Sequence, residues 1–242
     1  MLLSRVYLVR HGQAGTRKAY DTLSDLGRRQ ARLLGEFFAS ERIHFAAAYS
    51  GELTRQQQTA EEVRAAYREA GACFPDVVSH SGWNEFDLDH VYRALAPMLC
   101  AEDAGFQKEY EEMVAQARLA AEQPDAQVNR RWMPVDKKLV HAWIQGKHAY
   151  QGESWQAFRE RVTACRAMLD VRDQDVVVFT SATPIAIWAA LAMEIEDIRV
   201  MRLAGVLHNA SYSEVRLREG EVRLHSFNGV PHLRSPELRT YR

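Results

Sequence analysis

Arg10, His11 and Gly12 come directly after the apolar run VYLV at residues 6–9, and their types are suited to phosphate chemistry. An arginine guanidinium matches phosphate oxygens with a planar fork of donors and stays charged at physiological pH. A neutral imidazole nitrogen can attack phosphorus in line while arginines neutralise charge on the equatorial oxygens. Gly12 has no side chain, so we expect its backbone to approach the anion closely and to adopt dihedral angles that other residues resist.

Other polar residues follow apolar runs in the same way. Arg55 opens the segment after the second run, Glu85 follows the third, and Ser181 follows DVVVFT at residues 175–180. In open parallel sheets the ligand crevice lies outside the carboxyl ends of the strands, so these groups are expected to converge there. A carboxylic acid at such a site can protonate a leaving alcohol and later deprotonate the attacking water. Asp87, near Glu85, is the alternative carboxylate, and either could instead be solvated or paired.

Residue spacing predicts the elements that must position these groups. Short apolar runs predict strands at residues 45–50, 76–80 and 175–181, and helical spacing predicts helices at 25–40, 54–71 and 184–193. Ser24 is suited to cap the first helix, Gly71 to close the second, and Pro184 to the first turn of the last. The alternation of predicted strands and helices along the chain predicts a three-layer α/β/α sandwich with a mainly parallel sheet.

Residues 88–150 interrupt this alternation, and we expect them to form a helical insertion or lid within a single domain of residues 1–242. Pro97, Pro124 and Pro134 are expected to mark breaks in it. Near the other end, residues 209–228 alternate apolar and polar types around Glu219-Gly220, which predicts an antiparallel hairpin.

Composition narrows the classes of partner and cofactor. The chain has 31 Lys+Arg against 32 Asp+Glu, for a net charge of −1, so no nucleic-acid partner is expected. Its three cysteines include no C-x-x-C pair, which argues against a disulfide framework and a zinc site, and no metal or cofactor is expected. No apolar stretch approaches the roughly 18 residues of a membrane span and no leader is recognised, so we expect a cytoplasmic protein. The oligomeric state is not predicted by these features.

Five ordered motifs resemble those of the histidine phosphatase superfamily, which includes the cofactor-dependent phosphoglycerate mutases. They are LVRHGQA (8–14), LSDLGRRQA (23–31), SGELTRQQQTA (50–60), WNEFD (83–87) and GESWQAFRERV (152–162). The resemblance implies a phosphoglycerate mutase-like fold and no metal. It also implies that His11 is the nucleophile that becomes phosphohistidine, that Arg10 and Arg55 clamp the phosphate, and that Glu85 is the proton donor.

The chain departs from the family pattern after the late strand. Most members carry a second histidine there, in a Ser-His-Gly turn, whereas this chain has Ser181 and Ala182 in those places. A serine gives a neutral hydrogen bond of about 1 kcal/mol instead of a charge-assisted bond of about 1.5 to 3 kcal/mol. Loss of a donor that acts mainly in the transition state lowers the rate by roughly 10² to 10³. Ser181 and the first N–H groups of the next helix are alternative donors to phosphate, and a plain N-cap is the other interpretation of Ser181.

The turn TSATP, combined with WNEFD and with SFNGVPHL at 226–233, resembles a subgroup of this family. The predicted activity is that of a histidine acid phosphatase-like enzyme, which hydrolyses a small phosphomonoester through a phosphohistidine on His11. One alternative is a phosphate-binding regulatory module with little or no turnover. The other is a phosphoglycerate-type mutase, which ranks lower because such mutases keep both histidines. The choice of substrate is expected to depend on residues 88–150.

Overall fold

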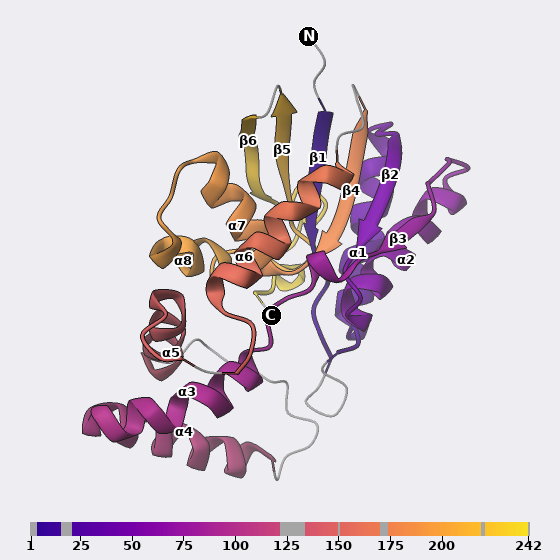
Figure 1. The fold of residues 1–242 in the computed structure, drawn as a ribbon. Helices are drawn as coiled ribbons and strands as arrows, with labels where there is room; N and C mark the ends of the chain where they lie inside the picture. The colour runs from indigo at the N-terminus through magenta and orange to yellow at the C-terminus, as the bar shows by residue number, and fades with distance from the viewer. Residues whose placement is uncertain are drawn as a thin grey trace. The chain divides into compact units, whose positions relative to one another are not determined.

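A six-stranded mixed sheet in the order β3-β2-β4-β1-β5-β6 forms the centre of the fold (Figure 1). In the computed structural model, β1 pairs in parallel with β4, β4 with β2, and β2 with β3, while β5 runs antiparallel to β1 and β6. The expected α/β fold with a mainly parallel sheet is therefore confirmed. The strands are β1 (Ser4–Arg10), β2 (Phe45–Ser50), β3 (Val77–Ser79), β4 (Asp175–Thr180), β5 (Tyr212–Arg218) and β6 (Glu221–Gly229).

The structure describes residues 4–15, 21–121, 134–149, 151–169, 174–218 and 221–241. Within these ranges the chain divides into two compact units. The first, here called the sheet unit, comprises the described residues of 4–15, 21–85 and 161–241 and contains every strand listed above. The second, here called the helical unit, comprises the described residues of 86–160.

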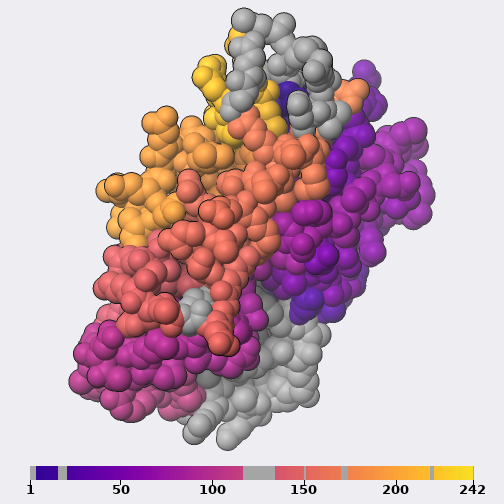
Figure 2. Space-filling model, in the orientation of Figure 1, coloured from indigo at the N-terminus to yellow at the C-terminus, as the bar shows by residue number. Residues whose placement is uncertain are grey.

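Helices cover both faces of the sheet (Figure 1). Helices α1 (Asp25–Ser40) and α2 (Thr54–Glu69) pack against each other on one face, where Leu34 and Val63 bury against Val9 and Phe179 of the strands. Helix α7 (Ala182–Ala192) contacts β1, β5 and β6. Figure 2 has the same orientation, and atoms of the orange part of the chain lie in front at the place where Figure 1 shows strands β1 and β4. Because side chains alternate along a strand, each central strand contributes to two apolar layers.

The caps expected from the sequence are confirmed. Ser24 Oγ accepts a hydrogen bond of 3.0 Å from the Gly27 amide at the start of α1. Gly71, with φ of +69°, follows the end of α2, and Pro184 is the third residue of α7. Strands β5 and β6 form the expected antiparallel pair, and its turn at residues 219–220 lies outside the described residues.

The helical unit consists of helices, as expected for residues 88–150. Pro134 is the first residue of a helix, and Pro124 lies outside the described residues. The break expected at Pro97 is wrong, because this proline lies inside a helix that runs from Leu88 to Glu102. Pro97 and Arg93 are both on its exposed face, so the carbonyl left without a helical donor can bond to water. The helices are α3 (Leu88–Glu102), α4 (Ala104–Ala121) and α5 (Pro134–Gln145), and α6 (Trp155–Ala164) follows.

Short helical segments complete the described chain. They are the 3₁₀ turns Ser81–Trp83, Cys165–Met168, Asp197–Arg199 and Pro236–Leu238, and the helix α8 (Val200–Ala204). Among the helices that the structure describes, none has the length and apolar character needed to cross a membrane.

His232 is a buried histidine of the sheet unit and gives a testable pH dependence of stability. It is 7% exposed, and neither ring nitrogen has a hydrogen-bond partner among the described residues. Burial lowers the pKa of His232 from 6.5 to about 4, and a weak interaction with the Ala210 backbone, which lacks the geometry of a hydrogen bond, opposes this only in part. The unfolded chain therefore binds more protons between these two pH values, so stability rises with pH through that window and is lost as pH falls.

We expect His232 to contribute a loss of about 3 kcal/mol in the free energy of unfolding between pH 6.5 and pH 4. Urea unfolding of the wild type and of His232→Leu across this range measures the effect, and the variant should show a shallower slope. His44→Leu, which changes an exposed histidine, is the control and should keep the wild-type slope. Equal slopes for the wild type and His232→Leu would contradict the prediction.

Candidate active site

His11 follows β1 directly, at the carboxyl end of the parallel strands. Its amide donates to the Thr180 carbonyl at 2.9 Å, and its carbonyl accepts from the Ala210 amide at 3.1 Å. The residue is 6% exposed. The end of β4 and the segment before β5 therefore hold the His11 backbone from two directions.

The His11 ring is oriented by the backbone of the next residue. Nδ1 lies 2.7 Å from the Gly12 carbonyl oxygen. A carbonyl can only accept a hydrogen bond, so the neutral ring carries its proton on Nδ1 and has its lone pair on Nε2. This is the tautomer that nucleophilic attack by Nε2 requires.

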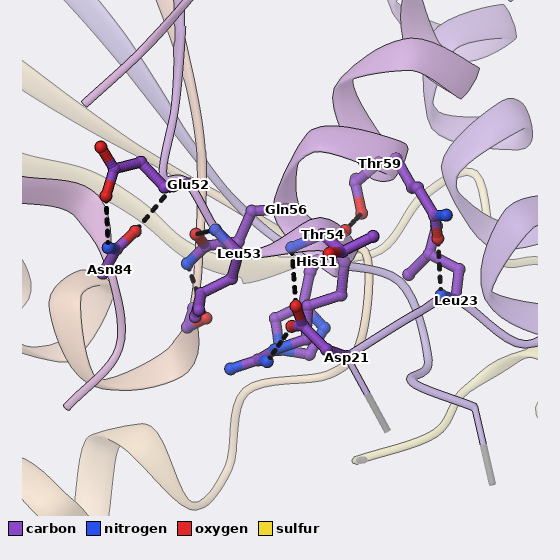
Figure 3. A network of polar contacts seen from close by, with 12 residues as sticks. His11, Asp21, Leu23, Glu52, Leu53, Thr54, Gln56, Thr59 and Asn84 are labelled. Carbon is purple, nitrogen blue, oxygen red and sulfur yellow. Dashed lines mark hydrogen bonds and ion pairs between the residues drawn. The ribbon is translucent and has the colours of Figure 1, made fainter. Parts of the chain in front are cut away.

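Gly12 and Thr59 connect His11 to the start of α2. The Gly12 amide donates to Thr59 Oγ1 at 3.0 Å, and this hydroxyl donates to the Arg55 carbonyl at 2.7 Å. Figure 3 shows Thr59 on α2 with its hydroxyl turned back along the helix. Sequence reasoning did not single out Thr59, although it belongs to the motif SGELTRQQQTA. These two hydrogen bonds hold the backbone that follows His11 in a fixed position relative to the backbone of Arg55.

The expectation that Gly12 adopts backbone dihedral angles that other residues resist is wrong. Gly12 does not have the left-handed backbone found at Gly71 and Gly146. A Cβ on Gly12 would collide with the Gly27 carbonyl of α1, and a Cβ on Gly27 would collide with the Gln13 backbone. Glycine is needed because two backbone segments pass too closely for a side chain.

Arg10 is the last residue of β1 and is 8% exposed. Its guanidinium donates from Nη1 to the Leu207 carbonyl and from Nη2 to the Tyr241 carbonyl, the latter at 2.8 Å. Its amide donates to the Ser211 carbonyl at 2.9 Å. Main-chain acceptors of two distant segments thus set the direction of the side chain, which no local pattern indicates.

Arg55 is the second residue of α2 and is 9% exposed. Its Nη1 donates to Asp21 Oδ1 at 2.6 Å. Sequence reasoning did not identify Asp21, because the pair is 34 positions apart and an isolated aspartate in a polar loop carries no signal of its own.

Glu85 and Asp87, the two candidate carboxylates, differ in their hydrogen-bond partners. Glu85 Oε2 accepts from the Thr183 amide in the first turn of α7 at 3.1 Å. Asp87 is the N-cap of α3, and its side chain accepts from the His90 amide at 2.9 Å. At least one of the α7 amides that sequence reasoning offered to an incoming anion therefore already binds the Glu85 carboxylate.

Ser181 occupies the N-cap position of α7, but its side chain makes no capping hydrogen bond. Its Oγ instead accepts from Gln56 Nε2 at 2.9 Å, and the same amide group donates to the Trp83 carbonyl at 3.1 Å. Gln56 is fully buried and was not identified from the sequence. Its helical spacing from the buried residues Thr59, Ala60 and Val63 was the available signal.

The sheet unit thus brings the predicted residues to the carboxyl ends of β1, β2 and β4. Hydrogen bonds through Gly12 and Thr59 connect His11 to Arg55, and a hydrogen bond connects Ser181 to Gln56, the residue after Arg55. Among the described residues, no group of three or more His, Cys, Asp or Glu side chains is placed to hold a metal ion.

An α/β protein with a histidine, two arginines and a glutamate at the carboxyl edge of its parallel strands has the parts of a phosphate-binding site. The chain belongs to the histidine phosphatase superfamily (branch 1), whose family model matches residues 6–143 and 126–229.

Solved structures with the same fold cover almost the whole chain. A phosphoglycerate mutase from Bacillus anthracis str. Sterne is 17% identical with a TM-score of 0.61, and the match covers 95% of each chain. Bacillus stearothermophilus YhfR is 16% identical with a TM-score of 0.63, and the match covers 95% of this chain and 98% of that one.

A sequence relative is the serine/threonine-protein phosphatase Pgam5, mitochondrial, of Caenorhabditis briggsae. It is 29% identical over 100 residues, which is 37% of this chain and 35% of the relative. The chain therefore matches about a third of that protein's length.

Proposed function

We propose that the protein hydrolyses a small phosphomonoester through a phosphohistidine on His11. The observation that carries this proposal is the Nδ1 contact of His11 with the Gly12 carbonyl, which makes Nε2 the nucleophile. Hydrogen bonds through Gly12 and Thr59 join this histidine to Arg55. Relatives whose names describe phosphatases, such as the putative alpha-ribazole-5'-P phosphatase of Escherichia coli, support hydrolysis.

In the first step, Nε2 of His11 attacks phosphorus and the bond from phosphorus to the ester oxygen breaks. The ring gains positive charge, which the Gly12 carbonyl stabilises, and the guanidinium groups balance the charge on the phosphoryl oxygens. Glu85, as the carboxylic acid, gives its proton to the leaving alcohol oxygen.

In the second step, water attacks the phosphorus of phosphohistidine. The Glu85 carboxylate takes a proton from this water, the P–N bond breaks, and inorganic phosphate leaves neutral His11 behind. These steps use only groups of the protein itself and water, and they are compatible with a cytoplasmic enzyme.

A panel of phosphomonoesters tests this function. Phosphate release is measured for each ester, and the enzyme is quenched in alkaline detergent during turnover, because phosphohistidine is acid-labile. The expected result is hydrolysis of at least one ester, with a labelled phosphoryl group on His11. Phosphate binding without hydrolysis across the panel would overturn the proposal in favour of a regulatory module. Transfer that requires a bisphosphate primer would overturn it in favour of a mutase.

We propose further that Ser181 stands in the place of the family's second histidine. Ser181→His is expected to raise kcat by roughly tenfold or more, because a charged donor would meet the phosphoryl group in the transition state. The variant must displace the Gln56 amide from residue 181, so the thermal unfolding midpoint is measured in parallel. Ser181→Asn adds a neutral donor and is the control. A kcat equal to or below that of the wild type in a folded Ser181→His protein would show that the pocket is adapted to the hydroxyl.

A further inference from the structure

The carboxylate of Asp21 binds the start of α2 and pairs with the Arg55 guanidinium, the group that the proposed mechanism assigns to phosphate. Oδ1 accepts from Arg55 Nη1 at 2.6 Å, and Oδ2 accepts from the Thr54 amide at 3.0 Å (Figure 3). Thr54 is the first residue of the helix, so its amide has no partner within the helix. An arginine and a helix-start amide together form the kind of site that favours an anion.

The chain around Asp21 is held on α2 without this carboxylate. The Leu23 amide donates to Gln58 Oε1 at 2.8 Å, and the Gly15 amide donates to the Thr22 carbonyl at 2.6 Å. Leu23 also forms an isolated β-bridge with Ala14. None of these bonds involves the Asp21 side chain, so they would remain if it turned away, and the carboxylate is not required to place the loop.

The energetics allow an external anion to replace Asp21. Its side chain is 47% exposed, whereas that of Arg55 is 10% exposed. A carboxylate this exposed recovers hydration when it leaves, and the arriving anion keeps the buried guanidinium paired. A phosphate dianion carries more charge and more acceptor oxygens than a carboxylate, so it is the stronger partner for a buried guanidinium.

We propose that Asp21 is an internal competitor of the substrate's phosphate: its carboxylate occupies Arg55 in the empty site and releases it when a phosphorylated ligand binds. Asp21 thereby weakens the affinity of the site for phosphate. This inference rests on the proposed function, because it assumes that Arg55 binds the phosphoryl group.

The test is calorimetric titration of inorganic phosphate into the wild type and Asp21→Asn. Asparagine keeps an acceptor for the Thr54 amide but loses the charge, so Kd for phosphate is expected to fall about three- to tenfold. Asp21→Ser is a second uncharged variant and should tighten binding in the same direction. Asp76→Asn, which changes an exposed partner of Arg64, is the matched control for net charge and should leave Kd unchanged.

Unchanged or weaker phosphate binding in folded Asp21→Asn and Asp21→Ser proteins would overturn the proposal, and weaker binding would make Asp21 a residue that orients Arg55. Arg55→Ala separates this failure from failure of the proposed function. If Arg55→Ala binds phosphate as well as the wild type, the proposed phosphate site itself is wrong. If only Arg55→Ala lowers the affinity, the site is correct and the competition by Asp21 is not.

Discussion

Replacing His11 by alanine is expected to lower turnover on the order of 10⁴-fold or more and to abolish phosphoryl labelling of the protein. The reason is that the proposed reaction proceeds through a bond between phosphorus and Nε2, and loss of a covalent nucleophile is among the largest effects known in enzymes. The backbone bonds of residue 11 to Thr180 and Ala210 do not involve the side chain, so the variant should keep the fold. The measurement is initial rate on the best ester of the panel, with labelling by the same ester.

Two controls make the His11 result specific. His44→Ala removes a histidine that precedes β2, at the opposite end of the strand from the site, and should keep wild-type turnover. Free imidazole should restore part of the activity of His11→Ala, because it can enter the vacated volume and attack phosphorus. Turnover of the His11 variant within a few-fold of wild type would exclude the phosphohistidine mechanism.

Glu85→Gln is expected to lower kcat/KM by about 10² to 10⁴ for alkyl phosphates, because an alkoxide leaves poorly without a proton. The loss in kcat/KM, which reports only the steps up to departure of the alcohol, should be much smaller for p-nitrophenyl phosphate, whose leaving group is stable as an anion. Glutamine can still accept from the Thr183 amide through its side-chain carbonyl, so the start of α7 keeps this partner. Values of kcat/KM for both esters with the wild type and the variant give the comparison.

The difference between the two esters distinguishes a proton donor from a merely structural residue. A structural role for Glu85 would lower both rates by the same factor, and that outcome would remove it from the mechanism. Asp87→Asn is the control, since asparagine is as good an N-cap for α3 as aspartate. It should leave both rates unchanged.

Most elements of the sheet unit were predictable from local pattern. The apolar run at residues 45–50 forms β2 with these bounds, Ser24 caps the start of α1, and Gly71 follows the end of α2, as their types indicate. These features depend on periodicity and backbone dihedral preferences within a few residues, which the order of residue types displays directly. Pro97 shows the limit of the same reasoning, because a proline on the exposed face of a helix need not end it.

The contacts that orient the site were not predictable in this way. Tyr241 supplies a carbonyl to Arg10 across 231 positions, and Gln56 meets Ser181 across 125. No helical or strand period relates such residues, and a backbone carbonyl carries no signature of its residue type. The close passage of Gly12 and Gly27 is likewise a property of two packed segments and not of either sequence motif.

The order of residue types alone determined which groups are available for chemistry here: a histidine and arginine after one strand, a second arginine after another, a glutamate, and a serine after the late strand. The tertiary structure decided the state of each group, namely the tautomer of His11, the carboxylate on Arg55, and the amide that binds Glu85. The physical reason is that side-chain identity is local, whereas hydrogen-bond partners depend on which distant backbone and side-chain groups the packed core brings within about 3 Å.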